Sequence, residues 1–186
     1  MHHSIKMGKY EAKFLDRKEY RQWDELVENS KEGTLFHSTK WLDIIGNYSL
    51  IGCYCNGNLV GGMPYYRRKI KGISMLTNPK LTPYQGIIYS DIEGKTVKQN
   101  SVRKEITREI LDFLLKKDKN VMLRLSPFAK DILPYIWRGF FSSVRYTYIL
   151  NVEDLSIVKE GIHNSLRRGM RKATKDGIKK KKGNDF

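Results

Sequence analysis

The spacing of apolar residues in the first half of the chain predicts strands joined by tight turns, with two short helices between them. Three segments have patterns typical of strands: 10–15, 50–55 and 59–66. Asn56–Gly57 separates the last two, and this dipeptide is the strongest short signal for a β-hairpin. Before the hairpin the apolar period lengthens to that of a helix. One helix is expected to begin at Asp16, where Glu19 completes a capping-box pattern, and Ser38 is expected to cap a second.

The second half of the chain predicts further strands and two more helices. The strands are expected at 73–77, 87–90, 121–125 and 146–152. A helix is expected to open at Ser101, and a short one holds Ile132, Ile136 and Trp137. A basic tip is expected before the strand at 73–77, formed by Arg67, Arg68, Lys69 and Lys71. This order of elements predicts an α+β, or mixed α/β, fold whose central sheet has roughly six mostly antiparallel strands flanked by helices on both faces.

The last part of the chain predicts one long amphipathic helix over 155–178. Its apolar residues recur at steps of three or four: Leu155, Val158, Ile162, Leu166, Met170 and Ala173. Gly177 supplies a stop after this stripe. Because an apolar stripe exposed to water is unfavourable, the stripe is expected to be buried. The predicted organisation is a domain at 1–154, a basic linker helix at 155–178 and a basic tail at 179–186.

Composition and charge narrow the class of protein. The chain has 186 residues, 40% of them hydrophobic, which excludes a disordered chain. The net charge is +15, and the segment from Lys159 onward has ten Lys and Arg residues against three acidic ones. Such a surface favours anionic partners: phosphorylated small molecules, nucleic acid or acidic lipid headgroups. No apolar run is long enough for a membrane span, so a cytoplasmic protein is expected. Cys53 and Cys55 are expected to be reduced thiols, and no metal site is expected.

Five segments between about Leu35 and Ile178 carry a family resemblance: FHSTKWLDIIG, NGNLVGGMPYYRRK, LTPYQG, WRGFF followed by RYTYILNV, and LRRGMRKATKDGI. In this order and spacing they resemble the GNAT superfamily, and within it the Fem-type peptidyl and aminoacyl transferases. The resemblance implies a GNAT-like fold. It also implies transfer of an acyl or aminoacyl group, from acyl-CoA or aminoacyl-tRNA, to an amino group of a nucleotide-linked cell-wall or surface-polysaccharide precursor.

The resemblance also carries an expectation about completeness. Fem-type proteins have two tandem GNAT-like domains, so this chain is expected to be the first domain with the first helix of the second, and to be inactive or incomplete alone. Between Tyr89 and Ser101 the chain lacks the Gln/Arg-x-x-Gly-x-Gly/Ala pattern that cradles the CoA pyrophosphate in GNAT enzymes. No tightly bound cofactor is therefore expected.

The candidate substrate-binding residues are Trp41, Tyr65, Arg67, Tyr84, Gln85, Arg167, Arg171 and Lys175. Trp41 fits a core position or an acceptor contact, while Tyr84 and Gln85 lie on a loop whose Gly86 permits close approach of a ligand. Tyr65 beside Arg67 suits stacking with charge. Arg167, Arg171 and Lys175 share one helical face that could clamp a diphosphate or an RNA backbone.

No residue pair identifies itself as nucleophile and base, so the catalytic residues are unassigned. Two alternatives to the enzyme stay open. One is a basic, non-catalytic nucleic-acid-binding module, which could include tRNA among its partners. The other is an inactive domain that associates with another chain through its last helix.

Overall fold

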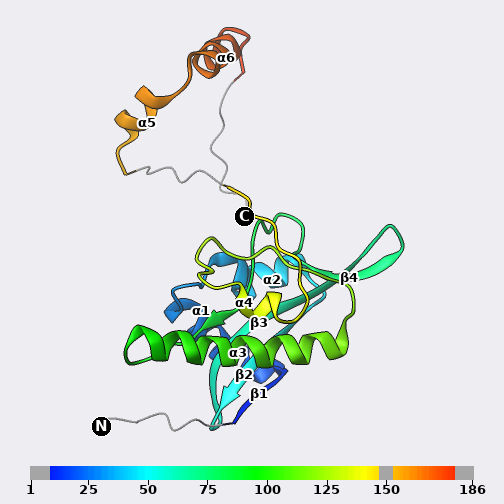
Figure 1. Ribbon diagram of the computed structural model, residues 1–186. Coiled ribbons are helices and arrows are strands. Elements are labelled where there is room, and N and C mark those ends of the chain that lie inside the picture. The colour runs from blue at the N-terminus through cyan, green and yellow to red at the C-terminus, as the bar shows by residue number, and fades with distance from the viewer. Residues whose placement is uncertain (1–8, 147–152, 179–186) are drawn as a thin grey trace. The chain divides into compact units, whose positions relative to one another are not determined.

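The structure is a computed structural model that describes residues 9–146 and 153–178. The chain forms two compact units, residues 1–142 and 143–186. The first unit contains a six-stranded sheet, shown in Figure 1: β1 Tyr10–Phe14, β2 Tyr48–Cys55, β3 Asn58–Ile70, β4 Ile73–Thr77, β5 Ile88–Tyr89 and β6 Val121–Met122. The strand order is β1-β2-β3-β4-β6, with β5 paired to β3. Every pair is antiparallel except β4 with β6, as the sequence predicted.

Two tight turns shape the long strand β3. Asn56 and Gly57 have φ of 51° and 80° and join β2 to β3, which confirms the predicted hairpin. Lys71 and Gly72, with φ of 49° and 83°, join β3 to β4. The predicted basic tip is therefore wrong for most of its residues, because β3 runs to Ile70 and only Lys71 lies in the turn.

Helices cover both faces of the sheet. On one face lie α1 Tyr20–Asn29 and α2 Thr39–Ile45, and on the other lies α3 Thr96–Lys117, which Figure 1 shows in green. The pleat of β2 divides the core between the faces: Leu50 belongs to the cluster of Trp23 and Leu42, whereas Ile51 belongs to that of Ile106 and Ile110.

Adjacent glycines in β3 allow helices to approach both faces closely. A Cβ atom on Gly61 would lie 2.8 Å from Cγ2 of Ile106 in α3. A Cβ atom on Gly62 would lie 2.7 Å from Cζ3 of Trp23 in α1. Both contacts are shorter than van der Waals distance, so the glycines set the spacing between the layers.

Several boundaries differ from those the pattern predicts. Helix α3 begins at Thr96 rather than Ser101, because its first residues, including the apolar Val97, are not buried and add nothing to the apolar period. The strand expected at 121–125 is only β6, Val121–Met122, and it is not buried. The short helix is α4, Leu133–Ile136, and Trp137 beyond it is 62% exposed. The strand expected at 146–152 lies outside the described residues, apart from Tyr146.

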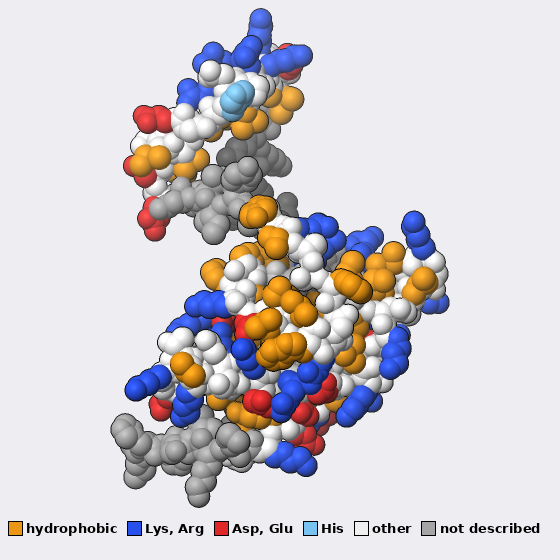
Figure 2. All heavy atoms as spheres, in the orientation of Figure 1, with side chains coloured by type: hydrophobic (Ala, Val, Ile, Leu, Met, Phe, Trp, Pro, Cys, Tyr) orange, Lys and Arg blue, Asp and Glu red, His pale blue; other side chains and the backbone are white. Residues whose placement is uncertain are grey.

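The second unit contains α5 Leu155–Gly161 and α6 Asn164–Lys175, so the single long helix expected over 155–178 is wrong. His163 has an extended backbone, and its Nδ1 accepts the Ser165 N–H at 3.3 Å, which starts a new helix. The described residues of the second unit do not bury the stripe, since Leu166 and Met170 are 59% and 57% exposed. Figure 2 shows apolar and basic side chains on different sides of this unit.

Candidate functional site

Two segments that carry the family resemblance meet in the first unit. The ring of Phe36 packs edge-to-face against Trp41 and against Tyr84, with centroids 5.4 Å apart in both pairs. The indole Nε1–H of Trp41 donates to Oγ1 of Thr82 at 2.9 Å, and the amide of Gln85 donates to the Phe36 carbonyl at 2.8 Å. We call these five residues the aromatic cluster. Three of them, Trp41, Tyr84 and Gln85, were predicted site residues.

The start of α2 positions Trp41. The Ser38 hydroxyl donates to the Leu35 carbonyl at 2.8 Å and accepts the Trp41 backbone N–H at 3.3 Å, which confirms Ser38 as the cap. The carboxylate of Asp24 in α1 accepts the backbone N–H of Thr39 at 2.9 Å. This capping holds Trp41 in the first turn of α2, where its ring meets the loop at 78–86.

The loop at 78–86 lies where two strands pair with different parts of β3. It joins β4, which pairs with β3 at 67–70, to β5, which pairs with β3 at 61–62. The backbone N–H of Gln85 donates to the Arg124 carbonyl at 2.8 Å, and the side chain of Asn78 accepts the Arg124 N–H at 2.9 Å. The loop is therefore attached to the chain beyond β6 as well as to α2.

A buried histidine lies behind the aromatic cluster. His37 is fully buried; its carbonyl accepts the Trp23 indole N–H at 2.8 Å, and its Nδ1 lies 2.9 Å from the Thr34 hydroxyl. Its Nε2 has no hydrogen-bond partner in the described part of the chain. Burial lowers the pKa of His37 from 6.5 to about 4, although the neighbouring backbone of Gly86 and Thr34 opposes the shift. The imidazole is therefore neutral at physiological pH.

Tyr65 and Arg67 share one partner, Asp118, at the end of α3. The Tyr65 hydroxyl donates to Oδ2 of Asp118 at 2.5 Å, and Nε of Arg67 lies 3.0 Å from Oδ1. The Asp118 side chain is 3% exposed. Burial and this hydrogen bond raise the pKa of Tyr65 to about 12. The two side chains connect β3 to the end of α3, and these contacts indicate a structural role for both.

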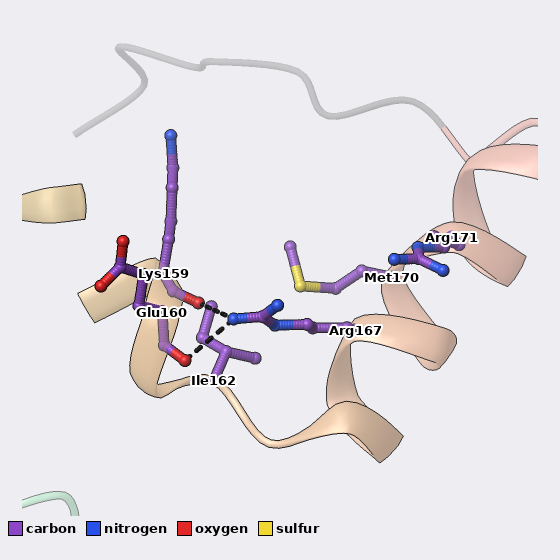
Figure 3. A pocket seen from close by; sticks show the side chains of 6 residues that line it. All are labelled: Lys159, Glu160, Ile162, Arg167, Met170 and Arg171. Carbon is purple, nitrogen blue, oxygen red and sulfur yellow. Dashed lines mark hydrogen bonds between the residues drawn. The ribbon is translucent and has the colours of Figure 1, made fainter. Parts of the chain in front are cut away.

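Arg167, Arg171 and Lys175 lie in the second unit, on α6. Nη2 of Arg167 donates to the carbonyls of Lys159 and Glu160, at 2.6 and 2.9 Å, and so caps the end of α5 (Figure 3). Arg171 and Lys175 are exposed. Arg167 and Arg171 also line an open pocket of about 440 Å³ with Met170. Of the three predicted residues, Arg167 therefore already has backbone partners.

Sequence reasoning missed several residues that matter here. Phe36, His37 and Thr82 were inside the quoted segments, so the resemblance could have indicated them. Asp118 had no sequence signal, because an acidic residue after a helix is ordinarily exposed. Cys53 and Cys55 are free thiols as predicted, and burial raises the pKa of Cys53 to about 12.

The described residues contain neither a metal site nor a membrane-spanning helix. Within residues 9–146 and 153–178, no group of His, Cys, Asp or Glu side chains could hold a metal ion. None of the helices described there combines the length and the apolar character needed to cross a membrane.

Comparisons with known proteins identify structural neighbours but no family. The chain matches no family model, and no curated protein matches it in sequence. A ribosomal-protein-alanine N-acetyltransferase from Brucella melitensis biovar Abortus 2308 is 16% identical with a TM-score of 0.47, covering 76% of this chain and 98% of its own. A Trypanosoma brucei acetyltransferase is 13% identical with a TM-score of 0.45, covering 77% and 98%. AAC(6')-Iy, in complex with the bisubstrate analogue CoA-S-monomethyl-acetylneamine, is 13% identical with a TM-score of 0.45, and the match covers 77% of this chain and 98% of AAC(6')-Iy. Since these TM-scores are below 0.5, the functional argument rests on the chain's own residues.

Proposed function

We propose that this protein is an N-acyltransferase and that the aromatic cluster holds one of its substrates. The observation that carries the proposal is the contact between segments 35–41 and 82–86, which are joined by the Trp41–Thr82 hydrogen bond across 41 positions of sequence. The motifs in both segments resemble those of Fem-type GNAT proteins. Their direct contact supports a shared binding role, because it places the residues of both motifs at one surface of the first unit.

The surface around the cluster suits a ligand with both apolar and polar parts. Trp41 and Tyr84 are half-buried, while Leu35 and Leu81 on the same two segments are 61% and 83% exposed. The Tyr84 hydroxyl has no hydrogen-bond partner in the described residues, so it is available to donate to a substrate carbonyl. Small-molecule sites typically combine an apolar lining with a few convergent polar groups.

The proposed reaction is the attack of an amine on an acyl carbonyl. A C–N bond forms, the bond from the carbonyl carbon to the donor's sulfur or oxygen breaks, and the amine loses a proton to water or a nearby base. The thiol or ribose hydroxyl leaves with a proton. Such a reaction depends chiefly on positioning and on a donor to the developing oxyanion. The aromatic cluster would supply positioning, and the Tyr84 hydroxyl is the candidate donor.

The finer features of the proposal follow the resemblance. The donor would be acyl-CoA or aminoacyl-tRNA, and the acceptor a nucleotide-linked precursor of cell wall or surface polysaccharide. Helix α3 begins without a side-chain cap at Lys95, which leaves backbone N–H groups for a donor phosphate. Without the glycine pattern expected for CoA, the donor would bind weakly.

The test is an acyl-transfer assay with the full chain. Acetyl-CoA or aminoacyl-tRNA is offered with a nucleotide-linked peptide that has a free lysine amine, and products are measured by mass spectrometry. Because a ligand can bind without being turned over, the Trp41 indole N–H resonance is followed in parallel by NMR as each ligand is added.

We expect an acylated product or a shifted Trp41 resonance, and we expect Tyr84→Phe to weaken either effect. The matched control is Tyr66→Phe, because Tyr66 is a half-buried tyrosine of β3 outside the cluster. Absence of both product and resonance shift with every ligand, or an equal loss in both variants, would show that the cluster is only structural.

A further inference from the structure

Helix α6 separates its cationic and apolar side chains into two sectors. At about 100° per residue, Leu166, Met170 and Ala173 lie within about 60° of one another around the helix. The cations occupy the opposite side: Arg167, Arg168, Arg171, Lys172 and Lys175. Leu166 and Met170 are 59% and 57% exposed, so the described residues of the second unit leave the apolar sector largely uncovered.

The cationic sector is not neutralised within the described residues. No acidic side chain there forms an ion pair with Arg168, Arg171, Lys172 or Lys175. Asp176 is the one acidic residue in the α6 segment, and it lies at the C-terminal cap. Cations with no acidic partner among the described residues, beside an exposed apolar sector, suit a partner that is both anionic and able to cover apolar atoms.

Helix α5 extends the exposed apolar surface of the same unit. Leu155 and Ile157 are 63% and 66% exposed. The hydrogen bonds from Arg167 to the carbonyls of Lys159 and Glu160 hold the end of α5 against α6. Met170 lines the pocket between the two helices, as Figure 3 shows. The exposed apolar and cationic side chains of the two short helices therefore belong to one connected surface.

We propose that the α5–α6 unit docks on an anionic membrane surface. A helix of this kind lies in the plane of the interface, with its apolar sector among the upper acyl chains and its cations at the headgroups. An RNA partner would pair with the cations but leave Leu166 and Met170 in water. A second copy could cover the apolar sector, but it would bring two strongly basic helices together. Of these three partners, the membrane surface is the one that satisfies both sectors, and this proposal is independent of the proposed acyl transfer.

The experiment measures binding of the full chain to vesicles by flotation. One set of vesicles contains equal parts phosphatidylglycerol and phosphatidylcholine, and the other contains only phosphatidylcholine. We expect binding to the anionic vesicles alone and weaker binding as salt is added. Since each basic residue near an anionic surface contributes a factor of about five, Arg171→Ala with Lys175→Ala should weaken binding about 30-fold.

Two further variants separate the contributions. Met170→Asp should abolish binding, because it places a charge in the inserted sector. The matched control is Lys98→Ala with Lys119→Ala, which removes two exposed lysines of the first unit and should leave binding unchanged. Melting temperatures of all variants confirm that the first unit stays folded.

Three results would overturn the proposal. The first is no preference for anionic over neutral vesicles. The second is binding to a single-stranded oligonucleotide without binding to vesicles. If Met170→Asp leaves this oligonucleotide binding intact, the unit is a nucleic-acid-binding surface. The third is a dimer in sedimentation that Met170→Asp dissociates, without vesicle binding, which would identify self-association.

Discussion

Buried His37 should make the stability of the first unit depend on pH in a window where few other groups titrate. The pKa of His37 is lowered by burial from 6.5 to about 4. Between these two values the unfolded chain binds a proton and the folded chain does not. Stability is therefore complete above about pH 6.5, falls as the pH drops, and levels off once the pH passes below about 4.

The size of the effect follows from the two pKa values. At pH 5 the unfolded histidine is almost fully protonated and the folded one almost fully neutral, which costs about 2 kcal/mol relative to pH 7. The pKa of Glu19 is lowered to about 2, chiefly by the backbone N–H of Asp16, so its contribution is lost at lower pH than that of His37. For a chain of this size, the expected fall in melting temperature between pH 7 and pH 5 is about 4–8 °C.

The assay is urea unfolding of wild type and His37→Asn at several pH values between 7 and 5. Asparagine does not titrate in this range, and its amide can still meet the Thr34 hydroxyl. We expect the variant to be less stable at neutral pH but to lose much less stability on acidification. If both proteins lose the same free energy of unfolding, His37 is not the group responsible, and its burial or its pKa has been misjudged.

Three further predictions concern other parts of the chain. Asp118→Ala should lower the free energy of unfolding by about 2 kcal/mol in urea, because it leaves the Tyr65 hydroxyl and Arg67 without their shared carboxylate; an unchanged midpoint would contradict this. Leu166→Asp should change stability by no more than about 0.5 kcal/mol, since this side chain is exposed, and a loss of several kcal/mol would show that the helix is packed after all. Calorimetric titration with acetyl-CoA should show weak or no binding, because the pyrophosphate pattern is missing between residues 89 and 101, and a tight stoichiometric complex would show that this segment was misread.

Local signals in the sequence were sufficient for the first half of the fold. The Asn56–Gly57 turn, the capping box at Asp16 and the Ser38 cap are each set by a few neighbouring residues, and all three were predicted. The two-faced core was also expected, because the helix and strand periods place apolar residues on opposite sides of the sheet. These features depend on contacts within a few positions of sequence.

Features that depend on distant partners were predicted less well. Helix α3 extends to Thr96 through residues with no apolar period, and β6 pairs with β4 over two residues only. In the second unit, the apolar period is continuous across Ile162, but the periodic pattern does not reveal that His163 begins a new helix. The periodic pattern shows that the helix has one apolar and one polar face, but it does not show what covers the apolar face.

The candidate site illustrates the same limit more sharply. Tyr65 and Arg67 looked like ligand contacts because an aromatic ring beside a cation is a common recognition pair. A single buried carboxylate, Asp118, which lies 53 positions from Tyr65, gives both of them a structural role instead. Trp41 and Tyr84, by contrast, both pack against Phe36, and no buried charge explains the contact of these three rings. A side chain that keeps an unpaired polar group at the surface after folding is therefore the better functional candidate, and within the aromatic cluster this side chain is Tyr84, which is half-buried.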